Sequence, residues 1–213
     1  SINVTFRNCS QFNSIHDTTY WGIFGSNFSK NLTFDHVEFS RFDAHMGVTN
    51  ATIKDSSLGH QGISLIGFGL FTIENTKVSG RSFIGLRGDY GSTFDGDIVI
   101  RNCEYTPVKS GVTIISGSNS GSHDFGYTCY MPRSIKIDGF IINDESKVAR
   151  NYKGPQLFNN INPKLTSERF VEQYPYQVTR EVTIKNLTTK SGLPLMVSEN
   201  PYMFRNVKVT QDQ

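Results

Sequence analysis

The sequence lacks the features that build helical folds, metal sites or membrane spans. Stretches rich in Ala, Leu and Glu with a helical period are absent over its 213 residues, so the class predicted is all-β. It has only three cysteines, Cys9, Cys103 and Cys129, without a CxxC spacing. That number and spacing give neither a disulfide framework nor a zinc site. No run of about 18 apolar residues occurs, so no membrane-spanning helix is predicted.

An excess of charge of one sign is also missing. Lys and Arg number 21 against 19 Asp and Glu, a net charge of +2, and the basic residues are scattered. A face that binds nucleic acid would be strongly basic, so we expect no nucleic-acid partner. The motifs GxSxG and HExxH, the P-loop and the dinucleotide fingerprint are absent too. The sequence therefore supports no metal and no cofactor, Ca²⁺ included.

What the sequence does contain is a recurring short strand. Its template is apolar, polar, apolar, polar, then Asn, Asp or Gly, then a core residue. Alternating apolar residues form the inward face of a half-buried strand, and Asn or Asp tolerates the left-handed backbone of a turn. In this alignment His36 and Asp138 look displaced by one place. The template recurs at Ile2–Cys9, Leu32–Val37, Ala51–Ser56, Phe71–Thr76, Ile98–Cys103, Ile135–Phe140, Val182–Leu187 and Met203–Val207.

The spacing of these turns indicates stacked coils. Asp35 to Asp55, Asp55 to Asn75 and Asn186 to Asn206 are each 20 residues apart. That length suits one coil of three short strands and three turns, and longer gaps indicate loops added at a corner. Two strand sets at a constant offset favour a solenoid over a sandwich. The second set comprises Gly62–Gly67, Phe83–Gly88, Gly111–Ser116 and Leu193–Val197.

This coil pattern resembles the pectate-lyase-like superfamily, which includes polysaccharide lyases, glycoside hydrolases and phage tailspikes. The resemblance implies a right-handed parallel β-helix with carbohydrate as its commonest ligand. We therefore predict one all-β solenoid domain over residues 1–213, with about eight coils and long loop insertions. Residues 141–178 form the longest expected insertion, with no strand alternation before Val178. The strand pattern begins at residue 2, so we expect the domain to be a fragment of a longer chain.

Two groups of residues have a structural interpretation. Cys9 and Cys103 follow the turn position, so we expect both to be buried, free thiols that pack as small hydrophobic groups. Six N-x-S/T sequons also occur. Because a β-helix is rich in Asn, Ser and Thr, we expect these to be structural rather than glycosylated. They are Asn3, Asn8, Asn27, Asn31, Asn50 and Asn186.

Candidate catalytic residues come from successive coils. Stacked strands lie about 4.8 Å apart, so an acid, a histidine and an arginine at matching positions can meet and perform acid–base chemistry on a sugar chain. An alternative remains for Asp43 and His45. Counting back from Ile53 and Ile73 places His45 level with inward-facing Leu65, which favours a buried structural pair. The candidates are Asp43, His45, His60, Arg87 and Asp89.

Candidate substrate-binding residues are aromatic or lie in loops. Trp21 and Tyr90 could stack on sugar faces, while His123 and Asp124 come from a Ser/Gly-rich loop. The alternatives are that Trp21 packs under the first loop and that the Ser/Gly loop is merely solvated. We expect a ligand where Arg87, Asp89 and Tyr90 approach His60 and the loop bearing His123 and Asp124.

Two functions fit this sequence. The first is a carbohydrate-active β-helix that binds a polysaccharide and cleaves it as a lyase or glycosidase. The second is a non-catalytic shaft or adhesin segment of a phage tailspike or bacterial surface protein, for which a homotrimer is the expected assembly. Both predict an extracellular, cell-surface or virion location. A groove lined by acids and aromatics would favour the first, and a uniformly polar surface with a large trimer interface would favour the second.

Overall fold

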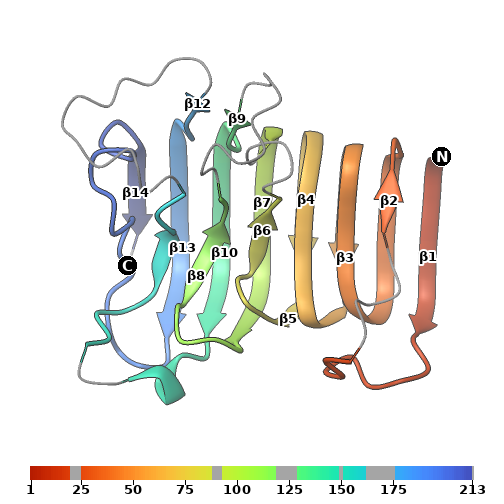
Figure 1. The fold of residues 1–213 in the computed structure, drawn as a ribbon, viewed down its shortest axis with the longest axis horizontal. Helices are drawn as coiled ribbons and strands as arrows, with labels where there is room; N and C mark the ends of the chain where they lie inside the picture. The colour runs from red at the N-terminus through yellow and green to blue at the C-terminus, as the bar shows by residue number, and fades with distance from the viewer. Residues whose placement is uncertain (20–24, 88–92, 119–128, 149–150, 162–175, 213) are drawn as a thin grey trace.

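The protein is a curled sheet of parallel strands. The computed structural model describes residues 1–19, 25–87, 93–118, 129–148, 151–161 and 176–212. Within these ranges twelve strands form one sheet that curls through 280°, and β9 and β12 form a second, two-stranded sheet. Every pairing between strands is parallel (Figure 1). The all-β class is confirmed, and the curled parallel sheet is compatible with the predicted solenoid.

The strands differ widely in length because β3 and β4 continue around bends. A short 3₁₀ helix, η2 (Glu145–Lys147), follows β10. No helix in the described ranges is long and apolar enough to cross a membrane. The strands are β1 (Ile2–Ser10), β2 (Ser26–Asn27), β3 (Lys30–Lys54), β4 (Ser57–Glu74), β5 (Lys77–Gly80), β6 (Ile84–Leu86), β7 (Phe94–Pro107), β8 (Thr113–Ser116), β9 (Cys129–Tyr130), β10 (Ser134–Ile142), β11 (Gln156–Phe158), β12 (Tyr176–Gln177), β13 (Glu181–Thr189) and β14 (Lys208–Asp212).

The first predicted strand set stacks in register, except at its end. Ile98 of β7 lies opposite Phe71 of β4 and Ile135 of β10, so inward apolar residues form columns through the core. The last member of the set is β14, whose Val209 pairs with Val182. The predicted strand Met203–Val207 is therefore wrong. That segment forms turns, in which Met203 and Phe204 are buried, and the Phe204 ring stacks on Phe158 with 4.7 Å between the ring centroids.

A column of left-handed residues marks the bend in this strand set. Register places His36 opposite Asn8, and Gly139 opposite both Asn102 and Asn186. The predicted one-place displacement at His36 and Asp138 is therefore wrong, because the turn residues are His36 and Gly139. What the position requires is tolerance of positive φ rather than one chemical type. Its members are Asn8, His36, Asp55, Asn75, Asn102, Gly139 and Asn186, with φ between +47° and +73°.

Hydrogen bonds between side chains connect these bends along the axis. The Asn75 amide donates to Asp55 Oδ1 at 2.9 Å, and Asn102 donates to Asn75 Oδ1 at 3.4 Å. At Gly139 an added Cβ would come within 2.6 Å of Asn102 Oδ1, which explains the glycine there. A second column uses Asn3, Asn31 and Asn50 in the same way. Five of the six sequon asparagines have positive φ in these columns, which supports their structural interpretation: Asn3, Asn8, Asn31, Asn50 and Asn186.

The second strand set forms the face nearest the viewer in Figure 1. Phe42 of β3, Ile63 of β4, Ile84 of β6 and Ile115 of β8 lie opposite one another in turn, and Phe158 of β11 completes the row. Strand β11 lies inside residues 141–178, where the sequence predicted no strand before Val178. The sequence does not reveal this strand, because its three residues are too few to show an alternation of apolar and polar positions.

One buried acid ties residues 141–178 to the rest of the domain. The Asp144 side chain is fully buried and accepts hydrogen bonds from the Tyr152 hydroxyl at 2.6 Å and from the Ser191 hydroxyl and backbone N–H at 2.6 and 2.8 Å. An isolated carboxylate would be costly in the interior, and these three donors compensate it. The segment is thereby fixed against the turn that follows β13.

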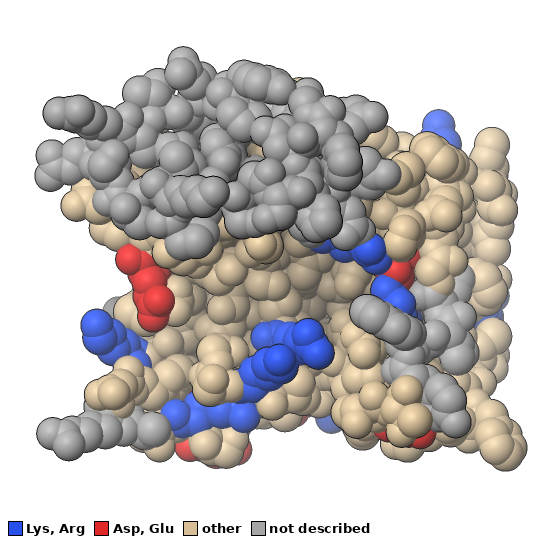
Figure 2. Space-filling model, in the orientation of Figure 1, with Lys and Arg blue, Asp and Glu red and all other residues tan. Residues whose placement is uncertain are grey.

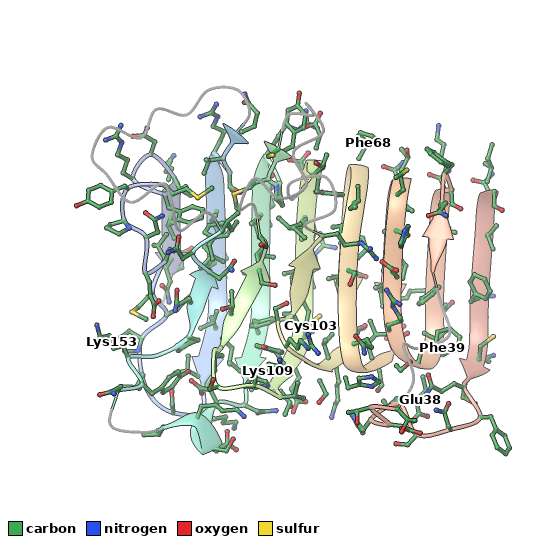
Figure 3. All side chains as sticks on the ribbon, in the orientation of Figure 1. Glu38, Phe39, Phe68, Cys103, Lys109 and Lys153 are labelled. Atoms are coloured by element: carbon green, nitrogen blue, oxygen red, sulfur yellow. The ribbon has the colours of Figure 1, made fainter. Side chains whose placement is uncertain are left out.

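The thiols differ in burial. All three cysteines are free; Cys103 (Figure 3) and Cys129 are buried, whereas Cys9 is only half-buried. Burial raises the pKa of the Cys103 thiol to about 12. The expectation of buried free thiols is therefore confirmed for Cys103 and holds only in part for Cys9.

Thiol labelling tests this difference. Only the thiolate reacts, so Cys103 should resist a maleimide or disulfide reagent in the folded protein, while Cys9 should react faster. Peptide mass mapping after timed labelling measures both sites, with the protein unfolded in denaturant as the control. Equal, rapid modification of both residues in the folded state would contradict the described packing.

The left-handed column can be tested at Asn75. Alanine there should cost roughly 1–2 kcal/mol for its left-handed backbone, in addition to the lost amide contacts, whereas glycine avoids most of the backbone term. We expect Asn75→Ala to be less stable than Asn75→Gly by about 1 kcal/mol in denaturant unfolding. Equal stability of the two variants would show that positive φ at this bend is not required.

Candidate functional site

A buried carboxylate lies on the outward side of the second strand set. Phe42 and Ala44 belong to the core, and successive residues of a strand point to opposite sides, so Asp43 between them points outward. Its side chain is nevertheless only 3% exposed. The residues at the matching position of the next two strands are small: Ser64 in β4 lies opposite Asp43, and Gly85 in β6 lies opposite Ser64.

Two arginines and a histidine surround this carboxylate. Arg41 pairs with Asp43 from the same strand. Arg87 Nη1 donates to both Asp43 oxygens, at 3.1 and 3.2 Å, from two passes away. Two strand spacings amount to about 9.6 Å, which a long side chain crosses because Ser64 and Gly85 leave room. His45 Nδ1 lies 3.3 Å from Asp43 Oδ2 and 2.9 Å from Arg87 Nη1. We call Arg41, Asp43, His45 and Arg87 the Asp43 cluster.

The inward position expected for His45 is wrong. Ala44, not His45, lies opposite Leu65, because the register between β3 and β4 shifts between Ala44 and Val48. Counting at a fixed interval from Ile53 crosses that irregularity and misplaces the histidine by one residue, which reverses its facing. The His45 side chain is 46% exposed.

Within the Asp43 cluster, one carboxylate is shared by two guanidinium groups. The shorter His45 contact has Arg87 donating to Nδ1, which puts the proton of the neutral imidazole on Nε2. In the other tautomer Nδ1 donates to Asp43 and Nε2 becomes an acceptor. The ring can therefore present either a hydrogen-bond donor or a hydrogen-bond acceptor to the surface.

The structure separates His60 from this cluster. His60 is buried, its backbone N–H donates to Ile15 O at 3.2 Å, and its ring lies beside Ile15 O and Gln61 Nε2. These contacts suit a structural residue that holds the loop after β1 against β4. The other predicted residues lie outside the described residues: Trp21, Asp89, Tyr90, His123 and Asp124.

Sequence reasoning missed Arg41. The signal was available, because Arg41, Asp43 and His45 alternate with apolar Phe42 and Ala44, so all three share one side of a strand. The contact with Arg87, 44 residues away from Asp43, could not be inferred without the register shift.

Among the described residues, one group has ligand atoms close enough together for a metal ion: Asp35, His36 and Asp55, within 4.8 Å of one another. Asp35 already accepts a hydrogen bond from Arg7 Nε at 2.8 Å and pairs with Lys54 Nζ at 3.2 Å. Two cationic side chains on the central carboxylate would repel a metal ion, so we assign no metal to this group.

The same contacts predict an acid-sensitive contribution to stability. Hydrogen bonds, first from His36 and then from Arg7 and Lys54, lower the pKa of Asp35 from 3.8 to about 2. A depressed folded-state pKa stabilises the protein above the unfolded value, and that contribution is lost as pH falls from about 4 to 2. Asp35→Asn should show a flatter loss of stability across this range in unfolding measured by circular dichroism. An unchanged slope would contradict the assignment.

Comparison with known proteins adds no assignment: no family model, curated protein or solved structure matches this chain.

Proposed function

We propose that this chain is a right-handed parallel β-helix of the pectate-lyase-like type, with about eight coils, that binds a polysaccharide across the Asp43 cluster. Cleavage by a lyase or glycosidase route is the activity that we favour. The supporting observation is a buried carboxylate held outside the core by two arginines, beside a half-exposed histidine. The expected location is extracellular, on a cell surface or on a virion.

The fold alone does not need this cluster. Asp43 contributes nothing to the core columns, and a buried ion pair is rarely more stabilising than apolar residues of the same size. Buried charged groups that are held by ion pairs are common at sites that bind a ligand. The adjacent small residues Ser64 and Gly85 give the Arg87 side chain room to reach Asp43.

In this proposal each residue has a separate role. The Arg41 and Arg87 guanidinium groups fix the position of the Asp43 carboxyl group through ion pairs and hydrogen bonds. Asp43 orients the His45 ring, and His45 Nε2 gives a proton to, or takes one from, the bound sugar. A turnover step needs His45 to alternate between the neutral ring, whose Nε2 takes a proton while its Nδ1–H donates to Asp43, and the protonated ring, which gives that proton back from Nε2.

A second candidate is the shaft or adhesin segment, with a homotrimer as its assembly. The observation in its favour is a surface of ion pairs between adjacent passes. Lys208 pairs with Glu181, and Arg133 with Asp95 and Asp97. Such pairing covers polar surface without creating a binding site.

A glycan array followed by assays for new reducing ends and for unsaturated products distinguishes the two candidates. We expect His45→Ala to keep its melting temperature, because the side chain is half-exposed, and to lower turnover about 100-fold or more. Arg87→Ala should weaken glycan binding as well, with some loss of stability, because Asp43 loses one of its partners.

The matched control is His16→Gln, an exposed histidine in the loop after β1. Binding and turnover that fall only in the cluster variants support the first candidate. Full glycan binding and turnover in His45→Ala would overturn the assigned role of the histidine. Loss of stability in Arg87→Ala with glycan binding intact would make the cluster structural and would favour the shaft.

A further inference from the structure

Charges alternate in sign along one outward column of the first strand set. The column lies one residue before the left-handed bend in the coils from Asn8 to Asn186. Arg7 Nε donates to Asp35 Oδ2 at 2.8 Å, and Lys54 Nζ lies 3.2 Å from the same oxygen. The strand register continues the alternation to the other end of the sheet. The members of this charge column are, in order, Arg7, Asp35, Lys54, Glu74, Arg101, Asp138, Lys185 and Asp212.

The two ends of the charge column have opposite signs. Within the described residues, β1 with Arg7 pairs only with β3, and β14 with Asp212 pairs only with β13. The Arg7 and Asp212 side chains are 63% and 59% exposed. Asp35, inside the column, contacts a cation on either side, whereas each end member has a neighbouring strand on one side only. A strand added beside β14 would continue the alternation with a cation, and a strand added beside β1 with an acid.

Both ends are also open edges of the sheet. Strands β1 and β14 lie at opposite ends of the row and run in the same direction (Figure 1). Proteins commonly protect an edge strand with proline or with several charged residues. Strand β1 contains no proline and has Arg7 as its single charged residue, and the surface over it, at the right of Figure 2, is largely uncharged. Its inward residues Val4 and Phe6 are only half-buried, so this edge offers both backbone groups and apolar surface.

We propose that these edges bind a second copy of this chain, with β1 of one copy pairing in parallel with β14 of the next. In the register that continues the charge column, outward residues meet outward residues and inward residues meet inward ones. A shift of one residue would reverse this match. The matched pairs are Asp212 with Arg7, Thr210 with Thr5 and Val209 with Val4.

The contact is a small one. Strand β14 has five residues, and its Gln211 continues the inward column of Ile184, where it would face Phe6 of the next copy. A polar amide at an apolar position weakens the contact, so the association is weak and depends on concentration. Because the coils stack along one axis, the same contact repeats and gives an open stack of copies. Such a stack differs from a closed homotrimer, and the inference does not depend on the proposed function.

Sedimentation velocity over a range of protein concentrations tests this proposal. The unaltered chain should form dimers and longer species that increase with concentration and decrease with added salt, because the terminal charges are exposed. Arg7→Glu and Asp212→Lys should each weaken self-association about tenfold, since each replaces an attraction by a repulsion. An equimolar mixture of the two variants should recover the longer species, because each edge of one variant is then complementary to the facing edge of the other. Recovery excludes local unfolding of an edge strand as the cause of the loss.

Gln211→Val should strengthen association about fivefold, because it continues the apolar inward column. Lys136→Glu and Glu145→Lys are the matched controls, since they change net charge by the same amounts at exposed positions outside β1 and β14. Both should associate like the unaltered chain. A chain that stays monomeric at every concentration, a trimer of fixed mass, or a mixture that does not recover overturns the proposal.

Discussion

The structure depends on a left-handed residue that recurs at the same bend of successive coils, from Asn8 to Asn186. A bend of this kind needs positive φ, which costs most L-residues 1–2 kcal/mol and costs Asn, Asp and Gly much less. Because the column from Asn8 to Asn186 occupies the same register position in successive passes, every strand leaves the bend in the same direction. The stacking of Phe71, Ile98, Ile135 and Val182 follows from that constraint, and so does the continuity of the core.

The column also explains what the sequence could and could not predict. Asn, Asp and Gly at regular spacing revealed the strand set, because these residue types report directly on backbone conformation. Where a histidine takes the left-handed position, as at His36, residue type gives no signal and register alone identifies it. At Asn206 the residue type was right, but no left-handed bend exists there and the strand lies later, at β14. A regular spacing of turn residues therefore predicts a further coil only where the strands beside those residues also pair.

The Asp43 cluster shows the same limit at the level of the site. Proximity of Asp43 and His45 could be read from alternation along one strand. The side of the sheet to which they point could not be predicted, because the amino-acid composition does not reveal the register shifts between β3 and β4. The approach of Arg87 depends on those shifts and on the small side chains of Ser64 and Gly85, so it becomes visible only in three dimensions. His60, chemically as attractive as His45, is committed to Ile15 by the loop after β1.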